Sequence, residues 1–249
     1  MTDFIPVNEP LLTGNEKKYL NECIDTGWIS SEGPFVKRLE TEFSAYCGQK
    51  FGSAVANGSV AIDVAIRALK EAYNWQDEDE VILPTFTIIS CAQSIIYNKL
   101  KPVFVDAEPI TWNIDVAKIE QAITKRTRAI MVVHIYGLPC DMNTILDLAK
   151  KYDLKIIEDS AQAHGQEYTG KKCGGFGDIS TFSFYPNKHI TTGEGGMIMT
   201  SNEIIAQKCN YLKNLCFTAE NRFVHNELGW NFRMSNLQAA VGVAQFEKI

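Results

Sequence analysis

The sequence lacks the features that mark several specialised classes of protein. No stretch approaches the ~20 consecutive apolar residues of a membrane-spanning helix. Residues 1–6 contain no basic segment followed by an apolar one, as a secretory signal would. No basic run is present, and the formal net charge is −6. We therefore expect a cytoplasmic protein, with neither nucleic acid nor a membrane as a partner.

Metal, disulfide and common nucleotide motifs are also missing. The seven cysteines are scattered and contain no Cys-x-x-Cys pair, which is typical of reduced thiols. The four histidines do not show the spacing of a zinc site, so no metal is expected. Neither Gly-x-Gly-x-x-Gly after a strand nor Gly-x4-Gly-Lys-Ser/Thr occurs. Dehydrogenase and P-loop kinase functions are therefore disfavoured.

Strand and helix patterns alternate along most of the 249 residues. Short apolar and β-branched runs, such as 129–133 and 154–157, alternate with amphipathic stretches such as 143–152. This alternation predicts an α/β fold with a mostly parallel sheet flanked by helices on both faces. A last helix is expected to begin at Ser235 and to be still running at Ile249.

One lysine lies between two predicted strands. A short apolar run ends at Ser183, Pro186 follows, and Lys188 precedes a glycine-rich turn that leads into residues 197–199. The mostly uncharged neighbours disfavour the ammonium form, so we expect the pKa of Lys188 to be lowered. A neutral lysine amine can form a Schiff base with a carbonyl compound.

An acidic pair follows another apolar run. Residues 154–157 lead to Glu158 and Asp159 at the expected carboxyl end of a strand, where open α/β sheets bind ligands. A Schiff-base lysine and a strand-end aspartate are what pyridoxal 5′-phosphate requires. The lysine binds its aldehyde, and the carboxylate keeps the pyridine nitrogen protonated so that the ring can accept electrons. Lys188 and Asp159 are therefore the predicted catalytic residues.

The turn after the strand at 51–56 predicts an anion site. Asn57, Gly58 and Ser59 open a helix, and the free N–H groups and dipole of a helix N-terminus attract a phosphate. From these residues alone, an ordinary serine N-cap is the alternative interpretation.

Taken in order, these motifs resemble the DegT/DnrJ/EryC1/StrS family of pyridoxal-phosphate-dependent sugar aminotransferases, in particular its 4-aminotransferases. The resemblance extends from the N-terminus to the last residue. It implies an aspartate aminotransferase-like large domain over residues 1–249, with an N-terminal lead-in. The family's smaller C-terminal domain is expected to be absent from this chain. The resemblance also implies a homodimer with shared active sites.

The resemblance further implies which residues contact the cofactor. Gly58, Ser59 and Ser183 would bind its phosphate, and Gln162 would bond its ring hydroxyl. Ile88 occupies a position that is aromatic in many family members and covers one face of the ring. Here the apolar contact would remain, but stacking worth ~0.5–1.5 kcal/mol would be lost.

Other implied roles leave alternatives open. Asn231 would reach across the dimer to the partner's cofactor phosphate. Alternatively, it would only belong to the segment that leads into the helix beginning at Ser235. Trp28, Ser30 and His189 are the implied substrate residues, although Trp28 could equally anchor the core. For His134, which ends a strand, local hydrogen bonding is the preferred interpretation over a catalytic role.

The implied reaction is a transamination in two halves. Lys188 would hold pyridoxal phosphate. L-Glutamate would donate its amino group to this cofactor, which gives pyridoxamine 5′-phosphate as the intermediate. That amine would then convert a nucleotide-linked 4-keto-6-deoxyhexose into a 4-amino sugar for polysaccharides such as O-antigen. The alternatives are C3 amination and 3-dehydration, and the related dehydratases carry His where Lys188 stands. A non-catalytic sugar- or cofactor-binding regulator is the alternative of another class, disfavoured because Lys188 and Asp159 are both present.

Overall fold

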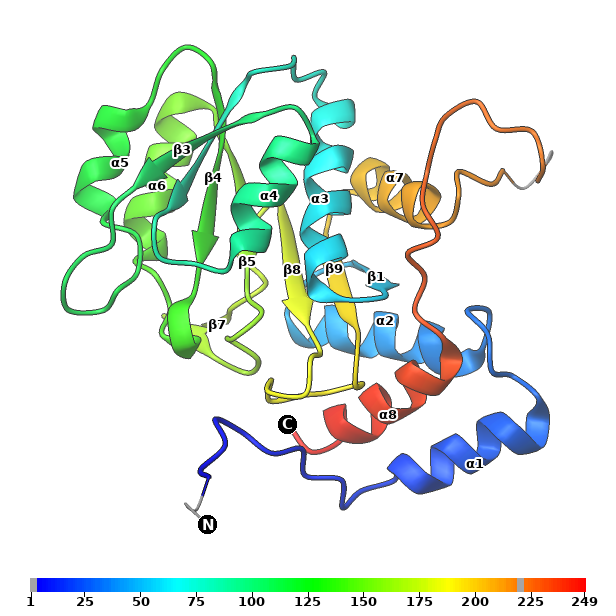
Figure 1. Ribbon diagram of the computed structural model, residues 1–249. Helices are drawn as coiled ribbons and strands as arrows, with labels where there is room; N and C mark the ends of the chain where they lie inside the picture. Colours follow the sequence, from blue (N-terminus) through cyan, green and yellow to red (C-terminus); the bar gives the residue numbers. More distant parts are fainter. Residues whose placement is uncertain (1–3, 219–221) are drawn as a thin grey trace.

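A seven-stranded sheet forms the centre of the computed structural model, which describes residues 4–218 and 222–249 (Figure 1). The strand order is β1-β9-β8-β5-β4-β2-β3. Strand β9 runs antiparallel to β1 and β8, and the other pairings in this sheet are parallel, as predicted. The strands of the sheet are β1 (Phe51–Val55), β2 (Glu80–Pro84), β3 (Lys101–Val105), β4 (Thr127–Val133), β5 (Lys155–Asp159), β8 (Ile179–Ser183) and β9 (Gly196–Thr200). A separate hairpin pairs β6 (Glu167–Tyr168) with β7 (Lys171–Lys172).

Helices cover both faces of this sheet (Figure 1). The helices of the described residues are α1 (Glu16–Thr26), α2 (Pro34–Tyr46), α3 (Gly58–Ala72), α4 (Ile89–Tyr97), α5 (Val116–Ala122), α6 (Met142–Tyr152), α7 (Glu203–Lys213) and α8 (Asn236–Phe246), with a short 3-10 turn at Ile135–Gly137. Of these, α1 packs against α8 rather than on the sheet (Figure 1). Strand β4 shows the two-sided burial, since Met131 faces the α3 and α4 side while Ile130 and Val132 face α5 and α6. Among the described residues, no helix is long and apolar enough to cross a bilayer.

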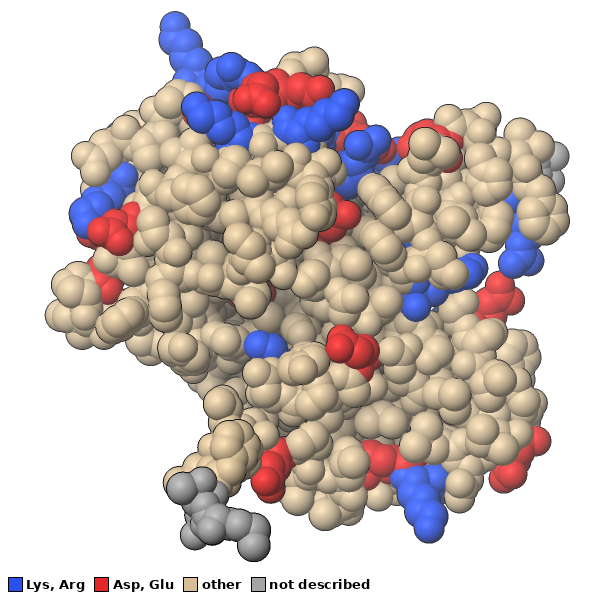
Figure 2. Space-filling model, viewed as in Figure 1, with Lys and Arg blue, Asp and Glu red and all other residues tan. Residues whose placement is uncertain are grey.

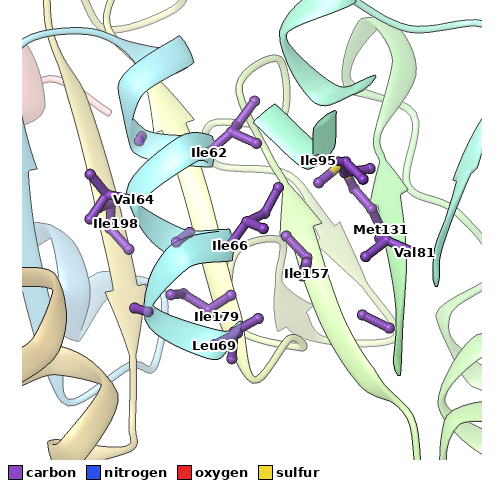
Figure 3. Close-up of a cluster of buried hydrophobic side chains, with 14 of the residues drawn as sticks. Ile62, Val64, Ile66, Leu69, Val81, Ile95, Met131, Ile157, Ile179 and Ile198 are labelled. Carbon is purple, nitrogen blue, oxygen red and sulfur yellow. The ribbon is translucent and has the colours of Figure 1, made fainter. Parts of the chain in front are cut away.

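Helix α3 is the element that fixes the site end of the sheet. Its buried Ile62, Ile66 and Leu69 recur at helical spacing and form one apolar stripe. Figure 3 shows this stripe beside Ile157 of β5 and Ile179 of β8. Because the stripe is anchored there, the N-terminus of α3 lies close to the carboxyl ends of these two strands.

The last helix ends earlier than the sequence predicts. Ser235 caps α8 through a reciprocal capping box with Gln238, as a helix start requires. The expected continuation to Ile249 is wrong, because α8 ends at Phe246. The amides of Lys248 and Ile249 bond carbonyls only three residues back, which tightens the final turn out of the α-helical form.

A buried carboxylate, Glu158, holds the loop after the β6–β7 hairpin against the sheet. It is fully buried, and it accepts the N–H groups of Phe176 and Gly177 at 2.9 Å each and that of Gly174. The Nε2 atom of His134 lies 3.0 Å away. Burial alone would raise the pKa of Glu158, but these hydrogen bonds outweigh it and hold the pKa below its usual value.

We predict that Glu158→Gln lowers the free energy of unfolding by about 3 kcal/mol, because an amide turns an N–H₂ group toward backbone donors. The depressed pKa also means that Glu158 stabilises the protein above its unfolded-state pKa. That contribution is lost as the pH falls through its folded-state pKa. Urea unfolding at several pH values measures both effects. Glu120→Gln, at a surface carboxylate paired with Lys151, is the control and should change little.

Candidate active site

A cleft of about 380 Å³ opens at the carboxyl ends of β4, β5 and β8, beside the N-terminus of α3. Figure 2 shows the molecule hollowed near the middle of this face, with most charged side chains nearer its edges. The cleft brings together many of the residues that the sequence predicts. Seven predicted residues line it: Gly58, Ser59, Ile88, Asp159, Gln162, Ser183 and Lys188.

Lys188 lies in the segment that connects β8 to β9. Its backbone N–H donates to Tyr185 O at 2.9 Å, and its carbonyl accepts the Asn8 side-chain amide at 3.2 Å. Burial lowers the pKa of the Lys188 amine, and the nearby carboxylate of Asp159 partly opposes that shift. The expected direction of the pKa shift is confirmed.

Asp159 is the last residue of β5 and is 2% exposed. Its Oδ1 accepts the Ala161 N–H at 3.0 Å, and its Oδ2 lies 3.3 Å from the thiol of Cys91. Burial raises the pKa of Asp159, against these hydrogen bonds and the charge of Lys188. The carboxylate therefore retains acceptor capacity on its cleft side.

Cys91 is a site residue that the sequence analysis missed. Burial raises the pKa of its thiol well above the usual value, so the group stays protonated and can donate to Asp159. Because its single hydrogen points at Asp159, the Thr87 hydroxyl 3.2 Å away must donate to the sulfur. Cys91 lies on α4, and no local sequence signal links it to the end of β5.

The opposite end of the cleft offers donors to an anion. Asn57, rather than Ser59, is the N-cap of α3, since its side chain accepts the Val60 N–H at 3.0 Å. The serine N-cap alternative is therefore wrong, because Ser59 lies inside the first turn. A Cβ on Gly58 would come within 2.7 Å of Ser183 Cβ, so glycine permits this close approach. First-turn amides have no partner within their own helix, so those of Gly58 and Ser59 remain for a ligand.

Gln162 is oriented by an unusual backbone turn. Tyr136 has a left-handed φ of 50°, and its N–H donates to Gln162 Oε1 at 2.7 Å. Since the oxygen is used there, the N–H₂ end of Gln162 is the part left to donate to a ligand in the cleft.

The cleft has an aromatic wall despite Ile88, whose side chain is exposed. Phe86 also lines the cleft, with its ring 5.1 Å from that of Trp112 and 6.3 Å from that of Tyr136. The sequence analysis considered only Ile88 as the residue that covers the ring, and it missed Phe86.

Several predicted residues do not line this cleft. Trp28 is 50% exposed, so its interpretation as a core anchor is wrong. Its carbonyl accepts Asn236 Nδ2 at 2.7 Å, and that of Ser30 accepts the Asn236 N–H at 2.6 Å, which fixes this loop by its backbone. His189 is exposed. His134 is buried and bonded to Glu158, in accord with the local hydrogen-bonding interpretation.

Asn231 is exposed and accepts Arg233 Nε at 2.9 Å. Its neighbours Trp230 and Phe232 line a groove of about 800 Å³ that continues from the cleft along α3 and α4, whereas Asn231 lines neither. The side chain of Asn231 therefore does not reach the cleft of its own chain.

Comparison with known proteins agrees with this geometry. The model of the DegT/DnrJ/EryC1/StrS aminotransferase family matches residues 10–249. This chain belongs to that family. It is 46% identical to a GDP-perosamine synthase from Escherichia coli O157:H7, over 98% of this chain and 66% of the relative. It is 44% identical to a dTDP-3-amino-3,6-dideoxy-alpha-D-galactopyranose transaminase from Aneurinibacillus thermoaerophilus, over 89% of this chain and 60% of that protein.

A solved aminotransferase from Psychrobacter cryohalolentis superposes with a TM-score of 0.90 at 34% identity, covering 98% of this chain and 64% of that one. The fold is thus that of the aspartate aminotransferase-like enzymes, as the sequence predicts. The chain spans 66% of the length of the GDP-perosamine synthase, just under two thirds.

We predict that Asp159→Asn stabilises the ligand-free protein. The folded-state pKa of Asp159 is raised, so the unfolding free energy of the wild type falls as the pH rises from its unfolded-state pKa through its folded-state pKa. The Asp159→Asn variant has no carboxyl group to ionise, so its unfolding free energy does not fall in this way. At neutral pH the variant should be about 1 kcal/mol more stable than the wild type. Denaturant unfolding from pH 4 to pH 8 checks it. Asp25→Asn, at an exposed position, should follow the wild-type curve, and an Asp159→Asn variant less stable throughout would contradict the prediction.

Proposed function

We propose that this protein is a pyridoxal-phosphate-dependent aminotransferase acting on a nucleotide-linked keto-sugar. The observation that carries the proposal is the meeting of Lys188 and Asp159 in one cleft. The other end of this cleft holds an anion cradle, formed by the Ser183 hydroxyl and the backbone amides of Gly58 and Ser59. A binding regulator of the same fold would need neither a lysine of lowered pKa nor a buried carboxylate with spare acceptor capacity.

The donor set fits the cofactor. Lys188 would bind its aldehyde and Asp159 its pyridine nitrogen. Ser183 and the amides of Gly58 and Ser59 suit its phosphate, and the N–H₂ group of Gln162 suits the ring hydroxyl. When bound, the cofactor supplies an electron sink for the bonds at the donor carbon.

The protein's own groups then move protons and exclude water. With its lowered pKa, Lys188 Nζ can take a proton from Cα of an amino donor, for which we propose L-glutamate, and can return one on the substrate side. Asp159, held by Cys91 and Ala161, would present its carboxylate to the ring nitrogen, and a protonated ring nitrogen would favour the charged form of the carboxylate. Phe86 and Ile88 cover the cleft with apolar surface.

The substrate we propose is a nucleotide-linked 4-keto-6-deoxyhexose, aminated at C4 as the name of the perosamine synthase relatives suggests. Amination at C3 is the second candidate, favoured by the similarity to the C3 transaminase. Lys188 disfavours 3-dehydration. A substrate of this kind implies cytoplasmic action and amino-sugar synthesis for polysaccharides. Trp28, Ser30 and His189 remain proposed substrate contacts, outside the cleft of a single chain.

We also propose a homodimer in which Asn231 serves the partner's site. Its neighbours Trp230 and Phe232 line the groove while its own amide points elsewhere, as alternation along an extended segment requires. Because Asn231 is exposed and lines neither the cleft nor the groove of its own chain, a partner chain is what its amide would serve.

Visible absorption tests the role of Lys188. We expect the chain with pyridoxal phosphate to show the absorption band of the lysine-bound cofactor, and L-glutamate to bleach it. Lys188→Ala should lack the band, whereas Lys125→Ala, at an exposed lysine, should keep it. A band that survives in Lys188→Ala, or is absent from the wild type, would refute the proposed function.

Mixing two inactive variants tests the shared site. If Asn231 acts across the interface, a mixed dimer of Lys188→Ala and Asn231→Ala chains has one site with both lesions and one intact site. We expect each variant alone to be at least tenfold less active than the mixture. The mixture should approach one quarter of wild-type activity, because about half of randomly paired dimers are mixed. No recovery in a mixture shown by mass to contain mixed dimers would mean that Asn231 acts within its own chain.

A further inference from the structure

One buried hydroxyl in the cleft has no partner. Thr181 is 1% exposed, and its Oγ1 makes no hydrogen bond to any part of the chain that the structure describes. The same is true of the two ring nitrogens of His164, which lies among aromatic rings outside the cleft lining. A buried polar group left unpaired costs about 1–3 kcal/mol, so it calls for an explanation.

Other buried threonines of this protein have a hydrogen-bond partner for their hydroxyl group. Thr200 Oγ1 donates to Asp178 O at 2.6 Å, and Thr191 Oγ1 donates to Phe184 O at 3.0 Å. The carbonyl of Thr181 is used by Ser160, whose N–H lies 2.9 Å away. Valine has the same shape without a polar group, so packing alone would favour valine at position 181.

The position of Thr181 suggests what its hydroxyl is for. Thr181 and Asp159 are register partners on the neighbouring parallel strands β8 and β5. Ser183 follows two residues later, on the same face of β8, and all three side chains line the cleft. Thr181 therefore lies at the carboxylate end of a polar wall whose other end is the anion cradle.

We propose that Thr181 is a further ligand-binding residue, whose hydroxyl bonds the ring-nitrogen edge of a phosphorylated pyridine beside the carboxylate of Asp159. This inference rests on the proposed function. A hydroxyl can both donate and accept a hydrogen bond. It can therefore bond to this edge whether the shared proton lies on the ring nitrogen or on the carboxylate. Ser183 serves the phosphate end from the same strand face.

The test uses pyridoxine 5′-phosphate, which has the ring nitrogen and the phosphate but no aldehyde. Because it cannot react with Lys188, calorimetric titration of the cofactor-free chain reports non-covalent recognition alone. We expect Thr181→Val to raise Kd about 5- to 10-fold, and Thr181→Ser to stay within about twofold of the wild type. Without ligand, Thr181→Val should unfold at the same or a higher denaturant concentration, because no bond is lost.

Thr200→Val is the matched control, since it removes a satisfied buried hydroxyl away from the cleft. It should show the opposite pattern, with lower stability and unchanged Kd. An unchanged Kd for Thr181→Val would overturn the proposal. So would a loss of ligand-free stability like that of Thr200→Val, because the hydroxyl would then be bonded without ligand. If the wild type itself fails to bind the probe, the proposed function fails together with this inference.

Discussion

The site depends on the burial of one carboxylate at the end of a parallel strand. Asp159 is almost entirely buried in the lining of the cleft, and this burial raises its pKa. A backbone amide, a thiol and the charge of Lys188 oppose that shift without saturating the group. The same burial weakens the ammonium form of Lys188. Burial thus shifts the pKa values of both groups toward their neutral forms, a feature that is common at functional sites.

The neighbouring carboxylate of Glu158 is also buried, but its role is structural. Consecutive residues on a strand face opposite sides, so Glu158 points away from the cleft. It is bonded to His134, Ser160 and three backbone amides, and its pKa is lowered rather than raised. The number of donors around each carboxylate distinguishes the two residues. The fully bonded one holds a loop, and the partly bonded one faces the ligand.

Local sequence could predict much of this arrangement, because the relevant residues follow strand ends or open a helix. The alternation of elements predicts the sheet, and parallel strands bring Asp159 and the segment before Lys188 to one edge. Gly58 and Ser183 meet for the same reason. Trp28 could not be assigned, because whether an aromatic side chain packs inside or faces solvent depends on the loop that carries it.

Cys91, Phe86 and Tyr136 escaped the sequence analysis because their roles arise only from tertiary contact. Cys91 approaches Asp159 through the packing of α4 on the sheet, although the two residues are 68 positions apart in the sequence. Tyr136 matters through a backbone N–H and a left-handed φ, which no side-chain pattern reports. Such contacts depend on strand register and helix placement, which are set by the core as a whole.

The incompletely bonded groups of the cleft share a thermodynamic consequence. Asp159, Thr181 and Lys188 are each less favourably surrounded in the ligand-free chain than they would be in water. A ligand that bonds to them relieves those costs only in the folded state, so its binding free energy adds to the stability of the fold. Selection for packing alone would replace such groups with apolar ones of similar shape. The meeting of three such groups in a single cleft is therefore physical grounds for regarding the cleft as built around a ligand.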